Sequence, residues 1–190
     1  MTISPMKFMG LKGIDFCRIE LQNVAAGPDT ILGGKEQTGQ GSVQLKLIND
    51  YALLGHAASA VGLSQGAFDY ALQYARQRQQ FGQPIGRFPA LGHVLSDLSC
   101  RLDAARLLVY RSAWLLDQDR KCSKEIAGAR CISAEVAVKS AMEGLQVLGG
   151  YGYTLEYDSQ RFVRDSIALL SLGKSQDYLY EQIGSSLGLA

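Results

Sequence analysis

The stretch PALGHVLSDLSCRLDAARLLV, residues 89–109, repeats its apolar side chains in alternating steps of four and three. The repeated positions are Leu91, Leu95, Leu98, Leu102, Ala105 and Val109. Because an α-helix has about 3.6 residues per turn, this spacing places all of them on one face. Pro89 suits the first turn, where its missing N–H is not needed. The stretch therefore predicts an amphipathic helix that packs against other helices.

Further helices are predicted on both sides of this stretch. Before it, an apolar residue recurs every seventh position, at Leu47, Leu54, Val61, Phe68 and Ala75. After it, a face of small and apolar residues that ends at Gly149 would let a neighbouring helix approach closely: Ala134, Ala137, Ala141, Leu145 and Leu148. One or two shorter helices follow, with Ile167, Leu169, Leu170, Tyr178, Leu179 and Ile183 as the predicted core. The predicted fold class is mainly α, an antiparallel four-helix bundle.

A short β segment is predicted before the bundle. Cys17, Ile19 and Leu21 occupy alternate positions, which indicates a strand with one buried face. The turn-rich connector AAGPDTILGG follows, and TGQGS at residues 38–42 leads into the first helix. We predict a remnant β segment and linker over residues 1–41 and a helical bundle domain over residues 42–190. Two strands alone are marginal in water, so this segment needs the bundle or another chain to pack on.

The composition narrows the class of protein. Nineteen basic and eighteen acidic residues give a net charge of +1, which provides no overall field to attract nucleic acid or an anionic membrane. Four cysteines without C-x-x-C spacing and two histidines argue against a metal site. The N-terminus MTISPMKFMG lacks the apolar core of a signal peptide, and no apolar run is long enough to span a bilayer. We expect a cytoplasmic protein with reduced thiols and no nucleic-acid or membrane partner.

Two glycine-bearing loops interrupt the helical pattern: RQRQQFGQPIGRF at residues 76–88 and QVLGGYGYTLEYDSQRFVRD at residues 146–165. The first contains Arg76, Arg78 and Arg87, and no acidic residue occurs from Tyr70 to Ser96. Arginines and free backbone N–H groups at helix ends can hold phosphate. Neither loop is a P-loop or a dinucleotide fingerprint, because the Walker lysine and a preceding strand are missing. Each loop alone is equally consistent with a tight turn between helices.

Three segments occur in an order and spacing that resemble the acyl-CoA dehydrogenase family: ARQRQQFGQPIGRF (75–88), QVLGGYGYTLEY (146–157) and RFVRD (161–165). The chain resembles the C-terminal helical domain of that family, preceded by the last strands of its middle β domain. The family's N-terminal domain and most of its middle domain are then expected to be absent. By this resemblance, Arg161, Arg164 and Asp165 are expected to have a structural role, as an ion-paired cluster inside the protein.

The resemblance implies FAD as the cofactor, bound across a boundary between subunits, and therefore a dimer or tetramer of this chain. The residues that it implies at the cofactor are Arg78, Gln80 and Phe81 at the pyrophosphate, Gln146, Gly149 and Gly150 at the adenosine end, and Ser175 as a hydroxyl donor. A guanidinium suits pyrophosphate because its planar fork donates two hydrogen bonds at once. For Arg76 and Arg87 a solvated position is equally consistent with the sequence.

The catalytic base is missing from the positions where the resemblance places it. Family members remove the α-proton of an acyl thioester with a glutamate, and its two usual positions correspond to Gly173 and Ala52. The carboxylate nearest to Ala52 is Asp50, which would point about 160–200° away around the helix. The sequence therefore leaves the catalytic residue unknown. His56 and His93 are expected to be packed or solvent-facing rather than catalytic.

The leading hypothesis is an FAD-binding subunit like an acyl-CoA dehydrogenase, acting in α,β-oxidation of an acyl thioester. A second chain, another copy or a different acyl-CoA dehydrogenase-like chain, would complete its active site. The substrate would be an acyl-CoA or an acyl-carrier thioester, and the sequence does not decide between them. The alternative is a repurposed bundle without redox chemistry, serving as an oligomerisation or regulatory module or as a non-flavin enzyme. Loss of both glutamate positions favours this alternative, whereas the retained loop residues argue against it.

Overall fold

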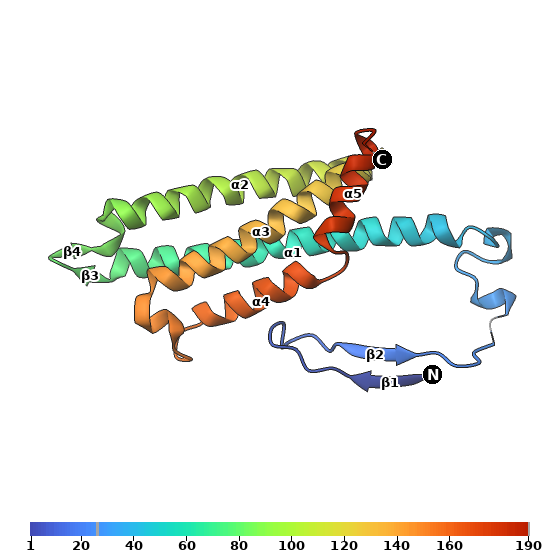
Figure 1. The fold of residues 1–190 in the computed structure, drawn as a ribbon, viewed down its shortest axis with the longest axis horizontal. Helices are drawn as coiled ribbons and strands as arrows, with labels where there is room; N and C mark the ends of the chain where they lie inside the picture. The colour runs from blue at the N-terminus through green and yellow to red at the C-terminus, as the bar shows by residue number, and fades with distance from the viewer. Residues whose placement is uncertain (26, 190) are drawn as a thin grey trace.

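The computed structural model describes residues 1–25 and 27–189, and its main body is a bundle of long helices (Figure 1). Ala26 in the predicted linker and Ala190 at the end of the predicted bundle lie outside the described residues. The bundle consists of α1 (Gly41–Gln77), α2 (Pro89–Asp117), α3 (Ser123–Val147) and α4 (Ser159–Ser171), and α5 (Gln176–Ser186) lies across the end where α2 leads into α3. Consecutive helices among the first four run in opposite directions (Figure 1). The predicted fold class, an antiparallel helical bundle, is confirmed.

Helix α2 buries the face that its sequence period predicts. Leu95, Leu98, Leu102, Ala105 and Val109 are all buried, and of the predicted set Leu91 alone is half-buried. Pro89 is the first residue of the helix, as expected. Burying a leucine side chain completely contributes about 1.5–3 kcal/mol, so this face accounts for a large part of the attachment of α2 to the core.

The predicted stripe on α1 is only partly right. Its buried positions are Leu53, Ala57, Ala60, Ser64, Ala67, Ala71 and Ala75, together with Asp50. Leu47 is exposed, and Leu54, Val61 and Phe68 lie half-buried at the edge of this face. The reason is the close approach of α3: a Cβ added at Gly144 would lie 3.3 Å from the Ala67 carbonyl oxygen. Small side chains permit that approach, so they displace the larger ones from the centre of the contact.

The end of α3 also differs from the prediction. The helix ends at Val147 instead of Gly149, and residues Gly149–Tyr153 form a short 3-10 helix, η4, where a loop was expected. A Cβ at Gly152 would collide with the Leu145 carbonyl oxygen, so this position requires glycine. The chain can fold back tightly here because Gly149 adopts a φ of 60°.

The predicted core of the last two helices is half correct. Leu169 and Leu179 are buried and Ile183 is half-buried. Ile167, Leu170 and Tyr178 are instead exposed, by 40%, 40% and 45% of their surface. Both α4 and α5 lie on the outside of the bundle (Figure 1): α4 contacts α3 and α1, α5 contacts α3, and these three residues lie outside the buried faces.

The N-terminal segment is a two-stranded antiparallel ribbon that lies beside α4 (Figure 1). Strand β1 (Thr2–Pro5) pairs with β2 (Cys17–Glu20), and every residue of both strands is exposed. The prediction of a buried face containing Cys17, Ile19 and Leu21 is therefore wrong. Within the described residues no second layer covers either side of the ribbon, so alternation in its sequence has no matching burial.

The loop between the two strands attaches the ribbon to α4. Asp165 Oδ1 accepts a hydrogen bond from the backbone N–H of Leu11 at 2.6 Å, and Arg164 Nη1 donates to the Met9 carbonyl at 3.3 Å. A Cβ at Gly10 would collide with the Arg164 carbonyl oxygen, so glycine permits this contact. Arg164 and Asp165 thus bind the ribbon, and Arg161 forms an exposed ion pair with Asp158, so among the described residues the predicted internal ion-paired cluster is not formed.

Two short 3-10 turns, η1 (Pro28–Thr30) and η2 (Lys35–Gln37), connect the ribbon to α1. Helix α1 begins at Gly41, beside the predicted boundary between residues 41 and 42, and the division into two domains stays a prediction. No helix within the described part of the chain combines the length and the apolarity that crossing a bilayer requires.

Candidate functional site

The first glycine-bearing loop is a tight β-hairpin at one end of the bundle. Arg78 caps the C-terminus of α1, and β3 (Gln79–Gln80) then pairs with β4 (Gln83–Pro84). The two residues between them, Phe81 and Gly82, have φ values of 51° and 80°, as a two-residue hairpin with a left-handed turn requires. Phe81 stands at the tip and is 92% exposed.

Arg78 contacts the second glycine-bearing loop. Its guanidinium carbon lies 5.7 Å from the centre of the Tyr151 ring in η4, a cation–π arrangement. The Tyr151 ring lies 5.4 Å from that of Tyr157, which in turn lies 6.3 Å from that of Tyr74 on α1. The two loops therefore meet at the same end of the bundle (Figure 1). Within the described residues the side chain of Arg78 makes no hydrogen bond and no ion pair.

The other residues predicted at the cofactor divide into two groups. Gln80, Phe81, Gln146, Gly149 and Gly150 are all exposed at the end of the bundle that Arg78 occupies. A Cβ at either glycine would meet nothing within 4 Å, so the surface there is open. The roles of these residues stay predictions.

Ser175 belongs to a different part of the molecule. Its hydroxyl oxygen caps α5 by accepting a hydrogen bond from the backbone N–H of Tyr178 at 3.3 Å. It follows Gly173, which packs against His56 on α1. His56 precedes Arg78 by 22 residues, which corresponds to about 33 Å along the helix. One copy of the chain therefore does not bring Ser175 to the loops at Arg78.

Arg76 and Arg87 are separated from Arg78. They line a groove of about 710 Å³ between α1 and α2, together with Ser96 and Ser99. The 3-10 turn η3 (Ile85–Arg87) carries the second of these arginines. The three arginines of the loop thus serve two different surfaces.

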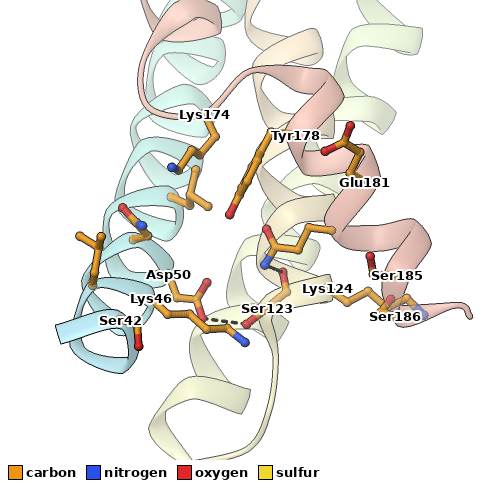
Figure 2. A pocket seen from close by; sticks show the side chains of 14 residues that line it. Ser42, Lys46, Asp50, Ser123, Lys124, Lys174, Tyr178, Glu181, Ser185 and Ser186 are labelled. Atoms are coloured by element: carbon orange, nitrogen blue, oxygen red, sulfur yellow. Dashed lines mark hydrogen bonds between the residues drawn. The ribbon is translucent and has the colours of Figure 1, made fainter. Parts of the chain in front are cut away.

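A second cavity lies near the opposite end of α1, between that helix, the start of α3 and α5 (Figure 2). It measures about 700 Å³ and is lined by Lys46, Lys124 and Lys174, none of which forms an ion pair within the described residues. Four serines, Ser42, Ser123, Ser185 and Ser186, and two carboxylates, Asp50 and Glu181, also line it. We call this space the lysine cavity. This cavity was not predicted from the sequence, because its lysines lie on three separate segments of the chain.

Asp50 lies in the lysine cavity but is held by the protein itself. Its Oδ2 accepts a hydrogen bond at 2.8 Å from the hydroxyl of Ser123, in the first turn of α3 (Figure 2). A carboxylate is favourable there because the N-terminus of a helix carries partial positive charge. Asp50 is buried whereas Ala52 is exposed, so the expectation that the two residues point to different sides of α1 is confirmed.

His56 occupies the space between the two expected positions of a catalytic acid. It follows Ala52 by one helical turn, and a Cβ added at Gly173 would lie 3.1 Å from its Nδ1. Gly173 has a φ of 81°, a conformation that disfavours any side chain. The ring is half-buried, and its Nδ1 is enclosed without a hydrogen-bond partner. Burial, and secondarily the positive charge of Arg130, lowers the pKa of His56.

Arg130 on α3 holds the turn that carries Gly173. It is 2% exposed, and its Nη2 donates hydrogen bonds to the carbonyl oxygens of Leu169 and, at 2.9 Å, of Leu172. These carbonyls lie at the C-terminal end of α4, where the regular hydrogen bonds of the helix run out, and the guanidinium supplies donors to them. Arg130 thereby fixes the turn that carries Gly173.

Comparison with known proteins agrees with this architecture. The family described as "Acyl-CoA dehydrogenase, C-terminal domain" matches residues 40–187. The relative "Probable acyl-CoA dehydrogenase YngJ" of Bacillus subtilis (strain 168) is 36% identical over 171 residues, which cover 90% of this chain and 44% of that protein.

Solved structures show the same fold. Butyryl-CoA dehydrogenase from Megasphaera elsdenii superimposes with a TM-score of 0.90 at 27% identity, covering 98% of this chain and 48% of that one. The FAD complex of PigA superimposes with a TM-score of 0.68 at 32% identity, covering 70% of this chain and 35% of that one. The chain thus spans less than half the length of these relatives. Because the family match extends over most of its residues, the chain belongs to the acyl-CoA dehydrogenase family, of which it contains the C-terminal helical domain.

Proposed function

We propose that this chain is the flavin-binding helical part of an oxidoreductase that oxidises an acyl thioester between its α- and β-carbons. Arg78 carries the proposal: its guanidinium has no anionic partner of its own and is set against the glycine-bearing loop of η4. A positive charge kept unpaired at an open surface suits an external anion. The diphosphate of FAD is the anion that family membership suggests.

The residues at this corner fit such a group. A guanidinium can donate two parallel hydrogen bonds to a diphosphate, and no carboxylate of the hairpin competes for it. The open surface at Gly149 and Gly150 leaves room for backbone contact with a ligand. Gln80, Phe81 and Gln146 complete the proposed contacts. When bound, FAD supplies the acceptor for the hydride that leaves the β-carbon.

A second chain is part of this proposal. The corner at Arg78 and the turn at Gly173 are separated by about 33 Å along α1, so one flavin would not serve both within one copy. Assembly with another copy, as a dimer or tetramer, or with an acyl-CoA dehydrogenase-like chain would bring the two regions of different chains together. The exposed ribbon also supports assembly, since Ile3 and Ile19 on it are each more than half exposed.

The lysine cavity supports a thioester that carries phosphate. Its three lysines form no ion pair in the described residues and outnumber its two carboxylates, Asp50 and Glu181, and its serines can donate hydrogen bonds to phosphate oxygens. Coenzyme A carries several phosphates and matches a cluster of cations better than a carrier protein with a single phosphodiester. Leu53 and Lys174 line this cavity and also flank Gly173, so the cavity adjoins the corner at His56.

A non-redox scaffold is the second candidate function. It is favoured by one observation: neither Ala52 nor Gly173, the expected positions of the catalytic glutamate, carries an acid. In that case the bundle would act as an oligomerisation or regulatory module, and the charge at Arg78 would have no ligand.

Visible absorbance of the purified protein titrated with FAD distinguishes the two candidates. We expect Arg78→Ala to weaken FAD binding at least about tenfold, since it removes charge-assisted hydrogen bonds. Arg120→Ala is the matched control, because Arg120 is also exposed and lies 6.0 Å from the ring of Trp114. If the protein, alone or mixed with a candidate partner chain, never retains FAD, the scaffold function is correct. If both variants bind FAD as the wild type does, Arg78 is not part of the flavin site and the proposal fails at that residue.

A further inference from the structure

A single imidazole lies at the contact between α1 and the turn from α4 to α5. His56 comes from the middle of α1, and Gly173 from the turn packs against its Nδ1. The turn itself is held in place by the hydrogen bonds of Arg130 to the carbonyl oxygens of Leu169 and Leu172. The ring is therefore positioned by three separate elements, α1, α3 and the turn.

The two nitrogen atoms of this ring have different surroundings. Nδ1 is enclosed and has no hydrogen-bond partner, which is unusual for a buried polar atom and costs about 1–3 kcal/mol. Nε2 has no hydrogen-bond partner within the described residues either, but it is not enclosed. A ring that makes no hydrogen bond of its own and keeps one nitrogen open has no evident structural purpose.

The exposed surface of α1 beside His56 is formed by small residues. Ala52, Gly55 and Ser59 lie one turn before, directly beside and one turn after His56, and all three are exposed. A Cβ at Gly55 would meet nothing within 4 Å. An extended ligand can therefore lie along this side of α1, beside His56. The lysine cavity begins at Leu53, in the same stretch of helix.

Charged groups around the ring keep it neutral. Arg130 on α3 is the charge that acts on His56, and together with burial it lowers the pKa of the imidazole. On the turn, Lys174 follows Gly173, with its ammonium 4.7 Å from the centre of the Tyr178 ring. On α1 the nearest carboxylate, Asp50, is bound to Ser123. A neutral imidazole has a free lone pair and is ready to accept a proton.

We propose that His56 is the catalytic base of this chain and that its Nε2 removes the α-proton of an acyl thioester lying along Ala52, Gly55 and Ser59. The C–H bond at the α-carbon breaks, its electron pair moves into the enolate of the thioester, and the proton forms an imidazolium with Nε2. The step is reversible and needs no oxidant. It rests on the proposed function, because oxidation to an enoyl thioester would follow from this enolate. The imidazole thus replaces the carboxylate that neither Ala52 nor Gly173 provides.

Exchange of α-hydrogen for deuterium tests this step without requiring any redox turnover. Butanoyl-CoA is incubated with the protein and FAD in deuterated water, and loss of its α-methylene signal is followed by NMR. We expect His56→Gln to slow the exchange at least about 100-fold, the usual contribution of a general base. His93→Gln is the matched control, because His93, the other histidine of the chain, is exposed on α2 and should have no effect. In the wild type the rate should rise with pH and level off at a lower pH than an ordinary imidazole would give.

A titration of the wild type tests the same proposal without any variant. Nitrogen-15 NMR of the two imidazoles should show a pKa for His56 below the ordinary value of an imidazole, and butanoyl-CoA should shift the His56 signals alone. Undiminished exchange in His56→Gln, no exchange by the wild type, or no effect of butanoyl-CoA on His56 would each overturn the proposal. Binding of FAD is measured separately by absorbance, so a protein that binds FAD but exchanges no α-hydrogen disproves the base and leaves the proposed flavin site standing.

Discussion

Two arginines of the bundle, one buried and one exposed, show how the same type of side chain can stabilise the fold or remain available for a ligand. Arg130 is 2% exposed and donates its hydrogen bonds to carbonyl oxygens at the end of α4. Arg78 is exposed, its side chain has no hydrogen bond or ion pair in the described chain, and its guanidinium packs against the ring of Tyr151. The interior guanidinium completes the fold, whereas the outer one is available to another molecule. The contrast separates residues that determine stability from residues that are candidates for binding.

The contrast predicts the largest loss of stability at Arg130. Replacing it with alanine leaves the last carbonyls of α4 unsatisfied in a buried site, and we expect the free energy of unfolding to fall by about 3 kcal/mol or more. Urea denaturation followed by circular dichroism measures this change. Arg130→Lys keeps the charge but loses the planar fork, so it should be intermediate. A loss below about 1 kcal/mol for alanine would show that Arg130 is not a structural residue.

A smaller, pH-dependent effect is expected at His56, which lies beside Arg130. Its pKa is lowered in the folded state from the ordinary value of 6.5, so the unfolded chain binds a proton more readily. The free energy of unfolding should therefore be fully retained above that value and decrease as the pH falls below it. Urea denaturation at several pH values between about 5 and 7.5 measures the slope. His56→Gln should reduce the slope and His93→Gln should not; equal slopes in all three proteins would contradict the assignment.

The smallest effect on stability is expected at Arg78. Within the described residues its guanidinium interacts with the Tyr151 ring and forms no hydrogen bond or ion pair, and an exposed cation–π pair contributes about 0.5–1 kcal/mol. Arg78→Ala should therefore change the free energy of unfolding by no more than about 1 kcal/mol, again by urea denaturation without ligand. A loss as large as that of Arg130→Ala would remove the distinction between the two arginines and with it the argument that Arg78 is kept for a ligand.

The core residues were predicted well for elements with a broad, regular buried face and poorly for elements without one. On α2, which contacts the bundle over a regular face, the period of the apolar residues located the core almost without error. On α1 the same method selected Leu47 and Leu54 when alanines occupy the centre of the contact, because periodicity does not reveal how closely α3 approaches. On the ribbon, alternation at Cys17 and Ile19 predicted burial where no covering layer exists in the described residues.

Candidate sites within one continuous segment were predicted, whereas contacts between distant segments were not. The arginine and glycine loops were recognisable because each is a short continuous segment with an unusual composition. Their contact through Tyr151 and the chain of tyrosines behind it were not predicted, although the repeated tyrosines of YGYTLEY were a visible signal. The lysine cavity had no signal in the sequence, since Lys46, Lys124 and Lys174 come together only when three helices pack.

The amino-acid sequence by itself determined the helices and the loops that interrupt them, because hydrogen bonds and apolar spacing within a helix are local. It also determined that Ala52 and Gly173 carry no acid. Only the tertiary structure decided that Arg78 meets η4, that Arg130 closes α4, and that His56 fills the space in front of Gly173. Those contacts join residues far apart in the chain, and they depend on how closely helices with small side chains approach one another.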